Sequence, residues 1–580
     1  MCNKKTLAYI GDVKIDLFDY INKNSSFFKK QYLDIVYDLS NYQIKNQKLK
    51  EKLKIDGYSF WEISSIQEKN IYRNSLAFKT IKYLALKDII EKNKNKNIKI
   101  YSADYEIVRN LKEEFNFQNI LYFDYKPRLA DLIKRKIKIT KLFHYLSFIY
   151  FFLKNCNFKN SDNIIYTKKK YFIFSHFTHY DIKKFSRKIF YPKQWAHLWE
   201  LVKKDSNFLQ LFIPGKKLKF YFQIDNLLRK EKIADLKSEN FLNNIIFFKN
   251  FIEVIKNFKA IKSKINYSEL DETLKKNEKY KFFYRINKES FFSSFSGFIL
   301  LQNLLWIIVF ENLFKKLPKH DYGIYLFENQ PWEKILVKCW RKFNQGELIG
   351  YSHTTVNFWH LNYFNNSEYN LSNDFIDSSP DSIALSSEVS KNFLLEQSIS
   401  KDKLFEVEAL RYNWILDKKK NMNKKKLDNK ILFLGDYEPG INAKLVDIVN
   451  KIKFDLDKLG FEITFKPHPA TITKNIDRTI NLNYDDIEDL VDDYSYIVSS
   501  NSTSAIIETL SCGLNTFLFI DENNFDLSPI RNTQFEKKIN FFYNKEELLN
   551  KIKNTNKNEI INYYYLDKDL KKWKKKLNIN

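Results

Sequence analysis

The chain has 580 residues, of which 44% are hydrophobic and 17% aromatic, so it can build packed cores in several domains and is not a mainly disordered protein. Its 11 Gly and 10 Pro exclude collagen-like and proline-rich low-complexity architectures. A formal net charge of +27 favours an anionic partner, namely nucleic acid, an anionic membrane or a phosphorylated substrate, although an AT-rich coding sequence also enriches Lys, Asn, Ile, Phe and Tyr together.

Strand-like and helix-like segments alternate through the first part of the chain. This alternation predicts βαβ units around a mainly parallel sheet. The expected helices include residues 78–92 and 105–115, and the strand-like runs are residues 6–10, 33–36, 98–101, 120–123, 171–174, 323–327, 347–351 and 382–385.

Two apolar runs do not suit a spanning helix, which needs about 20 apolar residues. Residues 142–153 are too short, and residues 298–314 are interrupted by polar residues. We expect buried or interfacial helices, and lysine-rich flanks keep an anionic membrane surface open as a partner. No signal peptide is expected, because the N-terminal apolar stretch, residues 7–10, is shorter than a secretory core. The four Cys lie far apart without a Cys-x-x-Cys pair, which argues against disulfides or structural zinc and favours a reducing compartment.

Residues 417–430 are almost free of apolar side chains and predict an exposed linker. The linker would separate an N-terminal domain, residues 1–416, from a second domain, residues 431–544. The second domain is predicted to be a doubly wound α/β unit, followed by a basic helical tail, residues 545–580. Its expected strands are residues 431–434, 462–466, 496–498 and 516–520, and its expected helices are residues 443–459, 487–491 and 503–511.

Ligands of open parallel sheets bind outside the carboxyl ends of the strands, so the residues after each strand are the candidates for a site. Gly435 opens a loop after the first strand of the second domain, and glycine there permits close backbone approach to a ligand. In Lys466-Pro467-His468-Pro469, two prolines fix the backbone on both sides of a histidine that suits a phosphate oxygen.

Six polar residues in a row, 499–504, follow the next strand and open a helix. Backbone N–H groups and hydroxyls in that position predict an anion site, because capping the helix needs only one such residue. Glu508 lies four residues after Ser504 on the same helical face and can meet a ribose hydroxyl.

These segments resemble the donor half of GT-B glycosyltransferases. The His-Pro motif with the Ser-Ser run is especially similar to enzymes that use cytidine nucleotides, which include bacterial sialyl-, polysialyl- and Kdo-transferases and CDP-alditol phosphotransferases. The resemblance implies an α/β, GT-B-like fold of two Rossmann-like domains whose parallel sheets face a cleft. It also implies that the CMP phosphate is bound by His468, Ser499, Ser500, Ser502 and Thr503.

In the first domain, residues 57–62, 325–333 and 348–359 resemble an uncharacterised family of bacterial surface carbohydrate biosynthesis proteins. At residues 360–362 this chain reads His-Leu-Asn, where that likeness leads us to expect an Asp-Leu-Arg-like sequence. Glu328 and His353 end two predicted strands and should face the cleft, so they are our candidates for the catalytic base or a carboxylate nucleophile. The alternatives are that Glu328 caps the next helix and that His353 only orients the acceptor.

Further acceptor-side candidates, chosen from other strand ends and loops, are Glu333, the cluster His176, His179 and Asp181, and Asp12.

No metal site and no cofactor are predicted, because the acidic pairs at residues 485 and 489 and at 492–493 suit a solvated helix face. His468, Lys466 and helix dipoles would neutralise the donor instead.

The resulting hypothesis is a cytoplasmic glycosyltransferase of surface polysaccharide biosynthesis, soluble or peripheral at the inner face of the membrane. Its donor would be a CMP-activated acidic sugar such as Kdo or a nonulosonate, and its acceptor a glycan or a lipid-linked glycan. A CDP-glycerol or CDP-ribitol phosphotransferase and a sugar-nucleotide epimerase remain alternatives. A nucleic-acid-binding protein is the non-enzyme alternative, but no nucleic acid is expected because the lysines are scattered and form no recognised motif.

Overall fold

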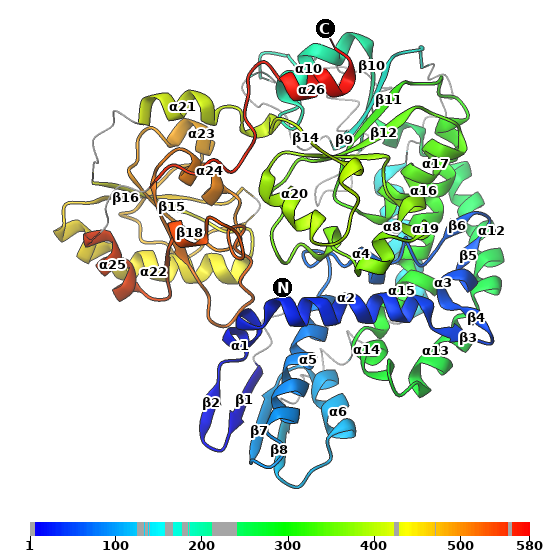
Figure 1. Ribbon diagram of the computed structural model, residues 1–580, viewed down its shortest axis with the longest axis horizontal. Coiled ribbons are helices and arrows are strands. Elements are labelled where there is room, and N and C mark those ends of the chain that lie inside the picture. The colour runs from blue at the N-terminus through cyan, green and yellow to red at the C-terminus, as the bar shows by residue number, and fades with distance from the viewer. Residues whose placement is uncertain are drawn as a thin grey trace.

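Two six-stranded parallel sheets organise the computed structural model (Figure 1). The structure describes residues 6–124, 133, 137–138, 140–156, 166–176, 184, 186–211, 241–422, 429–469, 471–554 and 559–579. The first sheet has the strand order β10-β9-β11-β12-β13-β14, and the second has β17-β16-β15-β18-β19-β20. The predicted α/β fold with two Rossmann-like domains is therefore confirmed.

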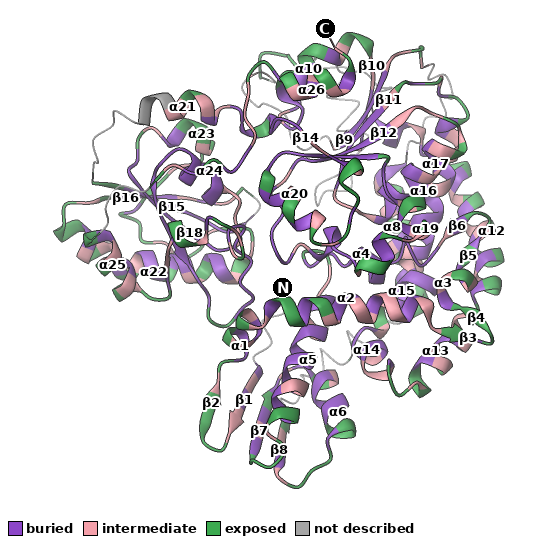
Figure 2. Cartoon of the chain, viewed as in Figure 1, coloured by how far each residue is buried: buried purple, intermediate pink, exposed green. Residues whose placement is uncertain are grey.

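The four strands predicted between residues 171 and 385 all belong to the first sheet. Each is a nearly continuous apolar run, as expected where helices cover both faces of a parallel sheet (Figure 2). Two strands were not predicted, because one has a polar start and the other has only three residues. The sheet consists of β9 (Tyr171–His176), β10 (Ser206–Leu211), β11 (Tyr322–Leu326), β12 (Glu347–Ser352), β13 (Ser382–Leu385) and β14 (Leu404–Glu406).

The second sheet confirms every predicted strand and helix of its domain. The long helix α22 (Pro439–Lys458) begins with proline in its first turn, and the Glu438 side chain caps it by accepting from the Ile441 N–H. The other elements are β15 (Lys430–Leu434), β16 (Glu462–Lys466), β17 (Asn481–Leu482), α23 (Ile487–Leu490), β18 (Tyr496–Ser500), α24 (Ala505–Ser511), β19 (Asn515–Phe519), β20 (Asn540–Phe542) and α25 (Lys545–Lys553).

A separate four-stranded sheet lies at the N-terminal end of the chain, with the order β2-β1-β7-β8. Its strands are β1 (Thr6–Ile10), β2 (Val13–Ile15), β7 (Ile98–Ser102) and β8 (Ile120–Asp124). β1 pairs antiparallel with both β2 and β7, and only β7 and β8 are parallel. The prediction of a mainly parallel sheet is therefore wrong for this part of the chain, which the sequence-based division did not separate.

The strand predicted at residues 33–36 is also wrong, because these residues lie inside α2 (Ser25–Asn41). Its buried side chains include Phe28, Tyr32, Val36 and Leu39, which recur at helical spacing and place one face of the helix against the core. A window of four residues was too short to reveal that period. The helices predicted at 78–92 and 105–115 are confirmed as α5 (Leu76–Lys92) and α6 (Tyr105–Glu114).

A helical layer joins β10 to β11 and covers one side of the first sheet. Within the described residues, one helical stretch, Lys288–Phe314, is long and apolar enough to cross a membrane by length and composition. Of its apolar 18-residue window, 72% is buried within the protein, so the stretch packs as a core element. The layer consists of α12 (Phe248–Ile265), α13 (Tyr267–Lys276), α14 (Lys281–Ile286), α15 (Lys288–Ser296) and α16 (Phe298–Phe314).

The C-terminal segment returns from the second domain to the first. The backbone N–H of Tyr565 donates to the Ser386 carbonyl at 2.9 Å, and α26 (Lys571–Leu577) shares a core cluster with α10 (Ala196–Val202). The C-terminus lies next to the first sheet (Figure 1). The predicted linker, residues 417–430, begins inside α21 (Ile415–Met422). Of the predicted tail, α25 packs on α22 of the second domain, whereas α26 belongs to the core of the first.

Candidate functional site

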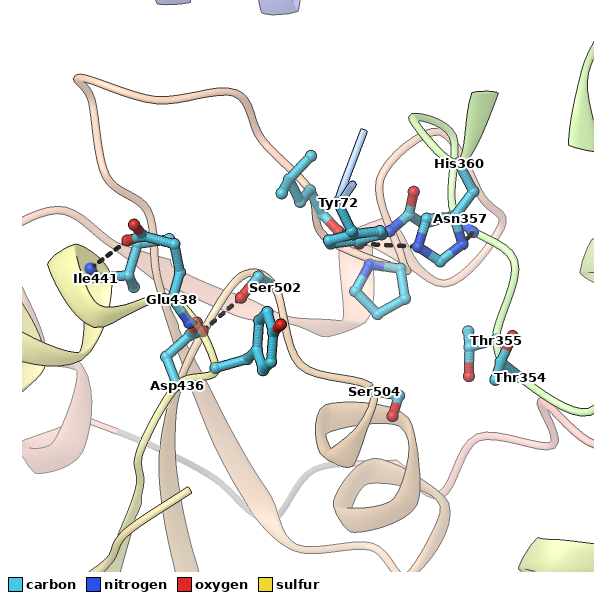
Figure 3. Close-up of a pocket in the computed structure, with 13 residues that line it drawn as sticks. Tyr72, Thr354, Thr355, Asn357, His360, Asp436, Glu438, Ile441, Ser502 and Ser504 are labelled. Atoms are coloured by element: carbon cyan, nitrogen blue, oxygen red, sulfur yellow. Dashed lines mark hydrogen bonds between the residues drawn. The ribbon is translucent and has the colours of Figure 1, made fainter. Parts of the chain in front are cut away.

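A cavity of about 330 Å³ opens between the two domains (Figure 3). The loops that line it include those that follow β12, β15 and β18, so the cavity adjoins the carboxyl ends of strands from both sheets, as expected for a ligand site in this architecture. The first domain contributes Tyr72, Thr354, Thr355, Asn357 and His360, and the second contributes Asp436, Tyr437, Glu438, Ile441, Ser502, Ser504, Leu527 and Pro529.

Asp436 organises the second-domain wall of the cavity. Its carboxylate accepts hydrogen bonds from the hydroxyls of Ser500 and Ser502, and also from the Glu438 N–H at 2.6 Å. Ser499 and Ser500 are fully buried. The Ser500 and Ser502 hydroxyls, which were predicted to bind a phosphate, therefore donate to Asp436 in this structure. Sequence reasoning missed Asp436, although an acidic residue directly after the first glycine of this loop was the available signal.

Gly435 permits a close approach, but to the protein's own backbone. A Cβ at this position would lie 2.9 Å from the His468 nitrogen and 3.1 Å from the Lys466 oxygen. The Gly435 N–H donates to that Lys466 carbonyl at 2.8 Å, and the Thr471 hydroxyl donates to the Tyr437 carbonyl at 2.7 Å. The loops after β15 and β16 are thereby fastened to each other, which sets the position of Asp436.

His468 and Lys466 stand next to the cavity and are not among its lining residues. The His468 ring meets the Tyr437 ring edge-on, with centroids 5.7 Å apart. Burial lowers the pKa of His468, the Lys466 charge lowers it further, and Asp436 opposes the shift. Burial likewise lowers the pKa of Lys466, against the pull of Asp486 and Asp485. A bound anion would raise the pKa of both groups, since it stabilises their charged forms.

The helix after the serine run places a buried carboxylate at the domain boundary. Glu508 on α24 is 5% exposed, and within the described part of the chain its carboxylate accepts no hydrogen bond. Burial raises the pKa of Glu508 to about 7, Arg411 of the first domain opposes the shift, and Glu488 adds to it. Thr503 accepts from the Ala505 N–H at 3.3 Å, directly before the helix begins.

A tyrosine and a histidine form the opposite wall (Figure 3). His360 Nε2 lies 2.8 Å from the Tyr72 hydroxyl, and the Asn357 N–H donates to His360 Nδ1 at 3.3 Å. His360 Nε2 and the Tyr72 hydroxyl therefore share a hydrogen bond in the wall of the cavity. Burial lowers the pKa of His360 to about 4, with help from Lys29, and raises the pKa of Tyr72 to about 12. Both side chains are therefore neutral near pH 7.

Glu328 and His353 come together at the ends of the neighbouring strands β11 and β12. Glu328 Oε1 lies 3.7 Å from His353 Nε2; His353 is buried and Glu328 is half-buried. Burial raises the pKa of Glu328, and Gln330 and Arg73 oppose the shift. Neither residue is among those that line the cavity, but His353 directly precedes Thr354 of its wall.

Glu333 faces this loop and not the cavity, so the prediction of an acceptor contact is corrected. Its carboxylate is 1% exposed and accepts from the N–H groups of Glu328, at 3.0 Å, and of Asn329, at 2.8 Å. Asn329 has a positive φ of 55°, a conformation that this pair of hydrogen bonds stabilises. Glu333 therefore positions Glu328, and the capping role considered for Glu328 belongs to Glu333.

The remaining candidates divide clearly. His176 ends β9, beside β11, and its ring meets the Trp332 ring at 5.7 Å, so it is the third strand-end residue on this edge of the sheet. Asp12 lies in the exposed β1–β2 turn and pairs with Lys99 at 3.3 Å, so its assignment to the acceptor side is corrected (Figure 1). His179 and Asp181 lie outside the described residues. In the described part of the chain, no group of three or more His, Cys, Asp or Glu residues is placed to hold a metal.

No protein-family model matches the chain, and no curated protein matches it either. Similar solved structures include UDP-GlcNAc 2-epimerase from Methanocaldococcus jannaschii, at 14% identity and a TM-score of 0.36, covering 67% of this chain and 94% of that one. UDP-GlcNAc 2-epimerase from Neisseria meningitidis, bound to UDP-GlcNAc, matches at 11% identity and a TM-score of 0.33, covering 66% of this chain and 90% of that one. MurG from Acinetobacter baumannii matches at 9% identity and a TM-score of 0.32, covering 66% of this chain and 89% of that one. Likeness at this level assigns neither a family nor an activity, so the fold assignment rests on the strand order of the two sheets.

Proposed function

We propose that this chain is a metal-independent glycosyltransferase of surface polysaccharide biosynthesis. The observation that carries the proposal is the cavity of about 330 Å³ that both domains line next to the carboxyl ends of their parallel strands. A site divided between two domains can bind a donor on one side and an acceptor on the other, and closure of the domains can exclude water from the reaction.

The chemistry of the wall suits a polyhydroxylated ligand. Hydroxyl, amide and carboxylate groups dominate the polar lining, with the rings of Tyr72 and Tyr437 beside them, and none of the described lining residues is Lys or Arg. Such groups exchange hydrogen bonds with sugar hydroxyls, whereas a phosphate favours cationic or N–H donors. We therefore assign the sugar to the cavity and the donor phosphate to the neighbouring residues Lys466, His468 and Thr503.

The donor assignment is a CMP-activated acidic sugar. The choice of cytidine over uridine rests on the likeness of residues 466–469 and 499–503 to cytidine-nucleotide enzymes. Glu508 would accept hydrogen bonds from the ribose hydroxyls. A glycan or lipid-linked glycan would enter from the first domain, where Glu328, supported by His353, would take the proton from its attacking hydroxyl. Burial raises the pKa of Glu328, which strengthens it as a base.

Release of CMP from a CMP-activated acidic sugar, dependent on a glycan acceptor, tests the proposal. Release of CMP from CDP-glycerol with transfer of glycerol phosphate to the acceptor, and no reaction of the CMP-activated sugar, would support the phosphotransferase instead. Isomerisation of a sugar nucleotide without any acceptor would support the epimerase. The three outcomes are distinguished by the donor consumed, by the group transferred and by the need for an acceptor.

The affinity for CMP should rise as the pH rises through about 7, the pKa of Glu508. Only the ionised carboxylate accepts from both ribose hydroxyls, so each pH unit below that pKa should weaken binding by up to about tenfold. Calorimetry across this range measures the effect. Glu508→Gln should bind more weakly and keep only the pH dependence that belongs to the ligand phosphate and to His468. The same pH dependence in both proteins would contradict the assignment of Glu508 to the ribose.

A further inference from the structure

The helix α8 (Lys141–Asn155) presents apolar side chains to solvent along one whole face. A surface helix normally carries polar residues there, because only one of its faces packs against the core. The inner face of α8 is also apolar, and Phe148 and Phe152 on it are buried. The outer residues are spaced as neighbours on a helix, and the exposed ones are Leu142 (66%), Phe143, Leu146 (55%), Ile149, Tyr150 and Leu153.

The neighbouring helix α12 also exposes apolar side chains. The Phe251 ring of α12 contacts the Phe148 ring at 5.8 Å and the Phe152 ring at 5.1 Å, which brings the two helices together. Phe248 and Ile252, one turn apart on α12, are both more than half exposed. We call the exposed residues of α8, together with Phe248 and Ile252, the apolar ridge. Exposed apolar clusters of this kind mark interaction sites.

Positive charge frames the ridge. α8 has lysines at both ends and no acidic residue, and α12 has five lysines and one glutamate. Lys154 Nζ lies 4.7 Å from the centre of the Tyr150 ring. Burial lowers the pKa of Lys262 on α12, and the nearby charge of Lys141 lowers it further. Lys141, Lys256 and Lys259 form no ion pair with any residue that the structure describes.

This combination fits a lipid surface better than a protein partner. Protein interfaces are depleted in lysine, whereas anionic headgroups attract it. Leucine, isoleucine and aromatic side chains can enter the boundary between headgroups and acyl chains while the lysines reach the lipid phosphates. An apolar ridge with a basic frame therefore has the charge and the polarity that complement an anionic bilayer.

We propose that α8 and α12 dock this protein onto an anionic lipid bilayer, with the apolar ridge inserted at the interface. The proposal goes beyond the transferase activity and does not depend on it. If docking failed, the assignment of the cavity would be unchanged. If the transferase assignment failed, the case for docking through the apolar ridge would be unchanged.

Sedimentation with vesicles tests the proposal. The protein should partition onto mixed phosphatidylcholine–phosphatidylglycerol vesicles more strongly than onto phosphatidylcholine alone, and added salt should weaken this preference. Leu146→Ser with Leu153→Ser should lower the partition coefficient by roughly tenfold or more, since burying one such side chain alone corresponds to about that factor. Both residues are exposed, so folding should be unaffected. The matched control is Phe454→Ser, at a residue 66% exposed on α22 of the second domain.

Three results would overturn the proposal. One is absence of binding to anionic vesicles or equal binding to both kinds. Another is a ridge variant that partitions as well as the wild type and the Phe454→Ser control. The third is a wild-type dimer that the ridge variant converts to a monomer, without lipid binding by either, which would identify a second copy of the chain as the occupant.

Discussion

Glu328→Gln should lower turnover by about 100-fold or more while leaving nucleotide affinity unchanged. The amide keeps the shape and the contact with Gln330 but cannot take a proton from an acceptor hydroxyl. His353→Asn should act in the same direction, because His353 lies 3.7 Å from the Glu328 carboxylate and is its neighbour at the strand ends. Steady-state turnover and calorimetric nucleotide affinity, measured on the same preparations, separate the two effects. Glu278→Gln, a change at an exposed carboxylate outside the site, is the matched control.

Near-normal turnover in both variants would remove this pair from the chemistry. His176, at the end of the adjacent strand β9, would then be the next candidate for the base. Lost nucleotide binding in Glu328→Gln would instead place the carboxylate on the donor side of the cavity.

Trp573→Ala should reduce the free energy of unfolding by about 3–5 kcal/mol, the range for deleting a buried tryptophan. Trp573 is fully buried, and its indole N–H donates to the Glu408 carbonyl at 3.0 Å. The Glu408 carboxylate also accepts from the Lys572 N–H at 2.8 Å and from the Trp573 N–H at 3.1 Å, so it fixes the start of α26. Denaturant unfolding measures the loss.

Lys575→Ala on the exposed face of the same helix is the control, and it should change stability by no more than about 0.5 kcal/mol. Equal stabilities of the two variants would mean that the C-terminal segment does not pack on the first domain. The packing matters for the site, because the segment that leads to α26 also carries Tyr564, whose hydroxyl lies 2.6 Å from that of Thr355 in the cavity wall.

Four strands of each main sheet were predicted, because each of these is a short, mainly apolar run. β16 (Glu462–Lys466) and β13 (Ser382–Leu385) were predicted to the residue. In the N-terminal sheet β1 (Thr6–Ile10) was also predicted to the residue, and β7 and β8 were predicted as strands, but the antiparallel pairing of β1 was not. Strand direction depends on which distant segments pair and not on local pattern. The three-residue strand β14 (Leu404–Glu406) carries too little periodicity to be recognised.

Part of the site followed from the rule that ligands bind at the carboxyl ends of parallel strands. That rule brought Glu328 and His353 together and led to the loops after β15 and β18. It could not find Tyr72, which reaches the cavity from the loop before α5 and meets His360 from a distant part of the chain. It also could not show that Asp436 takes the hydroxyls of Ser500 and Ser502, because that choice depends on the packing of the two loops.

The central claim, that the cavity binds a cytidine-activated sugar, is tested most directly by calorimetric titration with CMP, CDP, UDP and GDP. We expect CMP or CDP to bind more tightly than UDP and GDP. His468→Ala should weaken that binding by roughly 10- to 150-fold, the value of a charge-assisted phosphate contact, without changing the unfolding transition. UDP binding as tight as CMP binding would contradict the cytidine assignment, and absence of binding by all four nucleotides would contradict the claim itself.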